Sequence, residues 1–120
     1  MKLAEFVLSE EEARISSNAL DFIMCADNYT HCDSLVCHNN AFNAAEKVDA
    51  GNFSFSRSEV KAIIIAIDYS LQHMNDASEI TSHIEEDFPG IITALQESVP
   101  VLQALRVRLS AFSAKLSRRK

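Results

Sequence analysis

The sequence contains very few of the residues that bend or end regular structure. Its 120 residues include two glycines, two prolines and no tryptophan. Sandwiches and barrels with many tight turns use glycine and proline at those turns, so an all-β fold is disfavoured. The scarcity favours long helices joined by short connections. Neither a glycine-rich phosphate loop nor a Gly-x-Ser-x-Gly turn is present, and two glycines leave little room for either.

Long apolar runs and a disulfide framework are also missing. No stretch approaches the roughly 18 apolar residues of a membrane span, and the N-terminus becomes acidic too soon to be a signal peptide. The three cysteines are an odd number crowded into residues 25–37, which fits a reducing compartment. We therefore expect a cytoplasmic protein with no membrane partner.

Basic residues are scarce everywhere except at the C-terminus. Residues 1–100 carry five Lys or Arg against 17 Asp or Glu, whereas residues 101–120 carry six Lys or Arg and no acid. The net charge of −6 thus combines a body at −12 with a tail at +6. Such a tail can dock on its own acidic body, on another copy, or on an acidic partner such as nucleic acid.

The overall composition is that of one folded domain. Apolar residues make up 48% of the chain and charged residues 23%, which is ordinary for a globular protein. A chain of 120 residues is long enough for one hydrophobic core and too short for two independent ones. We predict a single all-α domain over residues 1–120, a compact helical bundle of two related hairpins plus a long C-terminal helix.

The two hairpins are inferred from an internal similarity. A shift of 47 residues aligns residues 6–22 with residues 53–69. The identical pairs are Phe6/Phe53, Ser9/Ser56, Glu12/Glu59, Ala19/Ala66 and Asp21/Asp68, against about one identity expected for random pairing. We interpret residues 6–52 and 53–88 as a duplicated unit, and the alternative is a chance similarity between two amphipathic helices.

Capping signals predict where the four helices of these repeats begin. The cap pairs are Ser9/Glu12, Thr30/Asp33, Ser56/Glu59 and Asp76/Glu79. Small residues at Cys37, Ala41, Ala44 and Val48 predict a buried stripe on the second helix. The third helix is apolar on more than one face, so we expect it to be central and most enclosed, with Ile64 and Ile67 in the core.

Residues 89–118 are predicted to form a C-terminal amphipathic helix with a regular apolar seam. The seam positions are Ile91, Leu95, Ser98, Leu102, Leu105, Leu109, Phe112 and Leu116. Their alternating steps of four and three residues are typical of a coiled-coil-like helix pair. Pro100 cannot donate to the carbonyl of Gln96, so either the helix kinks or Ser98 caps a new helix with Pro100 in its first turn.

This seam and its basic flanks are the predicted interaction site. The residues are Leu102, Leu105, Arg106, Arg108, Leu109, Phe112 and Leu116. An apolar seam with basic flanks requires a partner that is apolar and rimmed with acid, and the −12 body supplies one within the chain or on a second copy. We expect a homo-oligomer, with a dimer favoured.

The densest group of potential metal ligands is Cys25, His31, Cys32, Cys37 and His38. Zinc sites commonly use Cys-x-x-Cys or His-x-x-x-His pairs, and neither pair occurs here. We expect Cys37 to belong to the core stripe, Cys25 to lie at the end of the first helix as a small apolar residue, the two histidines to be solvated, and no metal or cofactor to be bound. The alternative is a zinc site.

Asp21 and Asp68 are a second possible metal-binding pair, because they occupy equivalent places in the two repeats. Paired carboxylates on facing helices hold metals in di-iron bundles, but those bundles also use Glu-x-x-His. None of the four histidines has a glutamate three residues before it. We interpret the two aspartates as flanking acids that the duplication repeated.

Three functions fit these features. The first is a non-catalytic protein-interaction module that self-associates and acts by binding another macromolecule. The second is a small nucleic-acid-linked regulator using the basic C-terminal helix, although no aromatic residues alternate with its charges. The third is a mobile-element-type inhibitor whose acidic body blocks a host nucleic-acid-binding protein. An enzyme is the class with least support.

Overall fold

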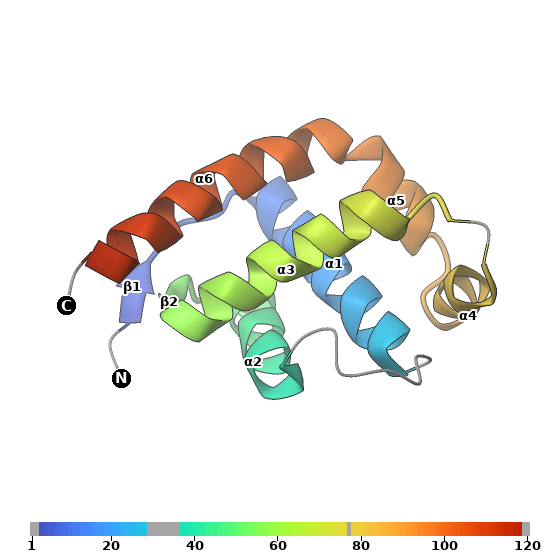
Figure 1. Ribbon diagram of the computed structural model, residues 1–120, viewed down its shortest axis with the longest axis horizontal. Helices are drawn as coiled ribbons and strands as arrows, with labels where there is room; N and C mark the ends of the chain where they lie inside the picture. Colours follow the sequence, from blue (N-terminus) through green and yellow to red (C-terminus); the bar gives the residue numbers. More distant parts are fainter. Residues whose placement is uncertain (1–2, 29–36, 77, 119–120) are drawn as a thin grey trace.

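The computed structural model describes residues 3–28, 37–76 and 78–118. These residues form six helices and one two-stranded sheet (Figure 1). In chain order the elements are β1 Leu3–Glu5, α1 Glu10–Asn28, α2 His38–Asp49, β2 Ser54–Ser56, α3 Arg57–His73, α4 Glu79–Asp87, α5 Ile91–Glu97 and α6 Val99–Arg118. The predicted compact, mostly helical fold is confirmed.

The central helix is α1, because it packs against each of the other five helices. Our expectation that α3 would be central was wrong. Figure 1 shows α3 lying across the front of the molecule with α1 behind it. Ile63 and Ile67 are buried, but Ile64 and Ile65 are only partly so. Apolar residues on several faces of a helix do not require burial on all of them, since much of any protein surface is apolar.

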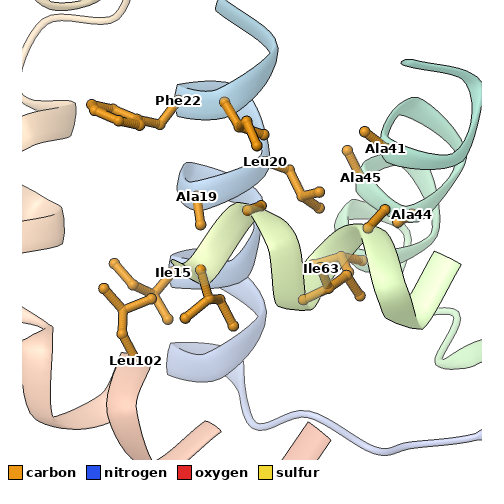
Figure 2. Close-up of a cluster of buried hydrophobic side chains, with 14 of the residues drawn as sticks. Ile15, Ala19, Leu20, Phe22, Ala41, Ala44, Ala45, Ile63 and Leu102 are labelled. Carbon is orange, nitrogen blue, oxygen red and sulfur yellow. The ribbon is translucent and has the colours of Figure 1, made fainter. Parts of the chain in front are cut away.

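Small residues allow α2 to lie close to α1 and α3. Ala41, Ala44 and Ala45 are buried, and Figure 2 shows them on the side of α2 that faces Leu20 and Ile63. The predicted stripe is thus confirmed from Ala41 onward.

Cys37 does not belong to this stripe, and its predicted place in the core was wrong. It precedes the first residue of α2 in extended backbone, with φ −68° and ψ 111°, and its side chain is exposed. The predicted cap pair Thr30/Asp33 lies outside the described residues.

The first and third helices begin with the predicted reciprocal caps. In α1 the Ser9 amide donates to Glu12 Oε1 at 3.0 Å, and the Glu12 amide donates to Ser9 Oγ at 3.1 Å. In α3 the Ser56 amide donates to Glu59 Oε1 at 2.7 Å, and the Glu59 amide donates to Ser56 Oγ at 3.2 Å. Equivalent positions therefore make the same bonds, although the duplication itself stays a prediction.

The fourth helix begins two residues later than predicted. Its cap is Ser78 with Thr81, whose amide donates to Ser78 Oγ at 3.2 Å. The Asp76 carboxylate instead pairs with the His73 ring at 2.7 Å. Threonine takes the place of the acid in this reciprocal cap, so the Asp-x-x-Glu spacing identified the wrong residues.

A small sheet, which we did not predict, ties the N-terminus to the start of α3. β1 pairs with β2 in antiparallel register, with Leu3 opposite Ser56 and Glu5 opposite Ser54. The Phe6 amide extends the pairing by donating to the Phe53 carbonyl at 2.9 Å. Strands of three residues are too short to show a clear alternation in sequence.

The C-terminal segment is split into α5 and α6. Ser98 has non-helical backbone angles, and its carbonyl accepts the Leu102 amide at 2.9 Å, so a new helix begins there with Pro100 in its first turn. This is the second of the two alternatives given for Pro100. Gly90 precedes α5 at φ 88°, a left-handed conformation that glycine adopts without strain.

Within the described residues, no helix has the length and apolarity needed to cross a membrane.

Candidate functional site

The predicted interaction seam lies inside the folded chain. Leu102, Leu105 and Leu109 are at most 1% exposed, and α6 packs against α1 and α3. Figure 2 shows Leu102 beside Ile15 of α1. The seam spacing identified a buried stripe correctly, but the stripe is covered by the chain's own helices. A dimer through these leucines would require α6 to leave the core, so self-association needs another surface.

The basic flanks of the seam also bind the chain's own body. Arg106 forms an ion pair with Asp68 of α3, and its Nη2 lies 3.1 Å from Asp68 Oδ2. Hydrogen bonding to Asp68 raises the pKa of Arg106 above its usual value. Arg108 forms an ion pair with Glu12 in the first turn of α1. Both arginines are therefore engaged within the fold.

An aromatic contact completes the docking of α6. The Phe6 and Phe112 rings lie with their centroids 5.0 Å apart, and the Arg108 guanidinium lies 5.1 Å from the Phe6 centroid. Phe112 and Leu116 are partly buried in this region. The last turns of α6 are thus held against the segment that follows β1.

Cys25 lies near the end of α1, as predicted, where it is buried and also contacts an acid. Its Sγ donates to Asp87 Oδ2 of α4 at 3.3 Å. Burial, followed by this hydrogen bond and the Asp87 charge, raises the pKa of the Cys25 thiol to about 12. Such a thiol is protonated at neutral pH and is a poor nucleophile.

Of the other candidate metal ligands, the two that the structure describes, Cys37 and His38, do not form a group with Cys25. His38 pairs with Asp27 at the end of α1, so it is not simply solvated, and Cys37 is exposed. His31 and Cys32 lie outside the described residues. Among the residues that the structure describes, no three His, Cys, Asp or Glu side chains form a group able to hold a metal.

Asp21 and Asp68 have different surroundings, despite their equivalent places in the repeats. Asp68 binds Arg106 of α6. Asp21 is half-buried, and burial together with the Asp49 charge raises its pKa to about 6. The first aspartate thus faces another acid across the contact between α1 and α2, whereas the second is neutralised.

A groove runs along the side of α1 that the other helices leave open. It consists of two adjoining depressions of about 480 and 440 Å³, which share Asn18. The first depression lies between α1 and the end of α2, and the second lies between α1 and the turn joining α4 to α5. We call this surface the α1 groove. Its charged lining residues are Glu10, Arg14 and Asp49 in the first depression and Asp87 in the second.

Both wall acids occupy positions that the helix dipole disfavours. Asp49 is the last residue of α2 and Asp87 the last residue of α4, where Glu85 and Glu86 precede it. Carboxylates at helix C-termini are destabilising by about 0.3–1 kcal/mol each at an exposed site. Asp49 and Asp87 also contribute to the raised pKa values of Asp21 and Cys25. The groove walls therefore place negative charge at two helix C-termini.

The groove also offers apolar surface between these acids. Phe53 in the first depression is partly buried and Phe88 in the second is exposed, whereas the other apolar lining residues, Leu8, Val48 and Ile91, are buried. The Phe88 residue is 40% exposed beside Asp87, which is unusual for a large aromatic. Hydrophobic grooves on other proteins bind amphipathic helices, and the acids on these walls would favour a segment that is also basic.

The sequence reasoning did not identify the groove residues. One available signal was Glu85-Glu86-Asp87 directly before Phe88-Pro89-Gly90, which places three acids at the predicted end of a helix.

The family models, the curated proteins and the solved structures compared with this chain gave no match.

Proposed function

We propose that this chain is a non-catalytic protein-interaction module and that its α1 groove binds a basic segment of a partner. The observation that supports this most is the pair of wall acids, Asp49 and Asp87, at helix C-termini on either side of apolar surface. A cationic partner would offset the negative charge that these acids place at two helix C-termini, and grooves with a few charged groups are typical of binding sites.

A nucleic-acid partner has less support. Arg106 and Arg108 already bind Asp68 and Glu12, so they are engaged with acids of the body. Among the described residues outside α6, exposed acids outnumber the exposed bases, which are Arg14, Arg57 and Lys61. Such a surface repels phosphates.

The acidic surface also favours a second candidate function, which is inhibition of a host nucleic-acid-binding protein. The partner's basic site would then be the segment that the α1 groove receives. This candidate differs from the first only in the identity of the partner, so the same surface is tested for both.

The test compares capture of native partners by wild type, by Asp49→Lys/Asp87→Lys and by a control, Asp76→Lys/Glu97→Lys. Both double variants change the net charge equally, but Asp76 and Glu97 do not line the groove. We expect wild type and control to capture the same basic protein and the groove variant to lose it, with the loss confirmed using the purified partner. Equal capture by all three chains would contradict the proposal.

A further inference from the structure

The outer face of α6, opposite the buried seam, is apolar and exposed. Its outward positions follow one another at steps of four, three and four residues, and all four are exposed: Pro100, Ala104, Val107 and Ala111. We call these four residues the outer stripe. Val107 is 67% exposed, more than any other large hydrophobic residue that the structure describes. Figure 1 shows α6 along the upper edge of the molecule, with α1 and α3 below it. The steps of the outer stripe are those of a helix that packs along a second helix.

A depression of about 410 Å³ adjoins the start of the outer stripe, between the beginnings of α1 and α6. We call it the α6 depression. Its lining is Ser9, Glu11, Glu12, Pro100, Val101 and Ala104. Glu11 is exposed, whereas Glu12 forms an ion pair with Arg108. Among the described residues, this lining and that of the α1 groove have none in common. An exposed acid therefore lies beside the first residues of the outer stripe.

A cation lies at the other end of the same side of α6. Lys115 is exposed, and it follows Ala104 by eleven residues. Eleven residues make almost three whole helical turns, so Lys115 lies in line with Ala104 along the helix axis. Ala104 lines the α6 depression. Glu11 and Lys115 therefore mark the acidic end and the basic end of one side of the outer stripe.

We infer that two copies of this chain pair through the outer stripe, with their α6 helices antiparallel. A two-fold axis at Val107 brings the two Val107 side chains together and keeps the same side of each stripe on the same side of the pair. Lys115 lies eight residues after Val107 and Pro100 lies seven before it, which is about 12 and about 10 Å along the axis. The Lys115 side chain of each copy then faces the α6 depression of the other copy, beside Glu11.

Charge favours this antiparallel arrangement over a parallel one. In a parallel pair Lys115 would face Lys115 and Glu11 would face Glu11, and like charges that meet across an interface are costly. The antiparallel pair replaces both repulsions with two attractions between Glu11 and Lys115. Arg108 lies near the two-fold axis, and its ion pair with Glu12 of its own chain reduces the repulsion between the two copies of Arg108.

The interface is small, so its charge pairs should decide whether it forms. Residues 100–115 span about 23 Å of helix, and one helical face of that length is smaller than the roughly 800 Å² per partner of a standard interface. Attraction between exposed charges is screened by salt, since the Debye length falls from about 30 Å at about 10 mM to about 3 Å at about 1 M. We therefore expect dimers at low salt and monomers at high salt.

The test is sedimentation velocity of nuclease-treated full chains at low salt. Val107→Lys should be a folded monomer, because it places two cations at the two-fold axis and Val107 is exposed in the single chain. Glu11→Lys and Lys115→Glu should each be monomeric alone. Mixed in equal amounts, these two variants should form 1:1 dimers, because each lysine of one chain then faces a glutamate of the other.

The matched control is Glu10→Lys, which makes the same charge change one residue from Glu11. Glu10 is also exposed, but it lines the α1 groove, so this variant should dimerise like wild type. Dissociation of Glu10→Lys as complete as that of Glu11→Lys would overturn the inference, because net charge alone would then explain the loss.

The inference also fails if wild type is monomeric at low salt and hundreds of micromolar, or if it grows beyond a dimer. A dimer that persists in Val107→Lys, or a mixture of the two charge variants that stays monomeric, would contradict it too. Loss of association after nuclease treatment would show a nucleic-acid bridge and overturn it. A monomeric wild type that still captures a basic protein through Asp49 and Asp87 would leave the proposed function standing.

Discussion

Replacing Leu109 by alanine should destabilise the isolated chain strongly, because this seam residue is only 1% exposed. Truncating a buried leucine to alanine costs about 2–5 kcal/mol through lost burial and the cavity that remains. A domain of 120 residues has a total stability of roughly 6–18 kcal/mol. The substitution therefore removes a substantial part of the stability without any partner being involved.

The assay is equilibrium unfolding in urea, with Val107→Ala as the matched control on the same helix. Val107 is 67% exposed, so its truncation should change the free energy of unfolding by no more than about 0.5 kcal/mol. At high salt the midpoints should be independent of protein concentration, because the seam is covered within one chain. If Leu109→Ala matched Val107→Ala, or if the midpoints rose with concentration, the buried position of the seam would be refuted.

Three other measurements follow from particular contacts. Ile67→Ala should cost about 2–5 kcal/mol and Ile64→Ala clearly less, because only Ile67 is fully buried; equal losses in urea unfolding would contradict this. The pKa of Asp21 is raised from 3.8 to about 6 by burial and by Asp49, so the folded state holds this proton more tightly and loses stability as the pH rises between those values. The melting temperature of wild type should fall over this pH range, and it should fall less in Asp21→Asn. An unchanged pH profile would refute the raised pKa of Asp21. We expect EDTA to leave the melting temperature unchanged; a lower value with stoichiometric zinc would indicate a metal site.

Local features of this fold could be predicted from the sequence because they depend on residues close together in the chain. The cap pairs Ser9/Glu12 and Ser56/Glu59 act over three residues, and Pro100 acts on its own helical turn. The cap of α4 was missed because Ser78 with Thr81 competes with the more familiar Asp76 with Glu79.

The partners of each surface could not be predicted in the same way. The heptad spacing of Leu102, Leu105 and Leu109 identifies a stripe that must be buried, but it does not say which chain covers the stripe. The α1 groove joins Asn18, Asp49 and Asp87, which are distant in sequence and meet only after α1, α2 and α4 have packed. No local pattern contains that information.

The role of the α1 groove is tested most directly by nuclear magnetic resonance of one labelled chain. Labelled wild type is titrated at low salt with a short lysine-rich amphipathic peptide, and labelled Asp49→Lys/Asp87→Lys is titrated in the same way as the control. We expect amide shift changes confined to residues 13–21, 48–51 and 87–94, around the groove lining. Shift changes centred on residues 102–116, none at high peptide concentration, or equal changes in the control would contradict binding of a basic segment in the groove.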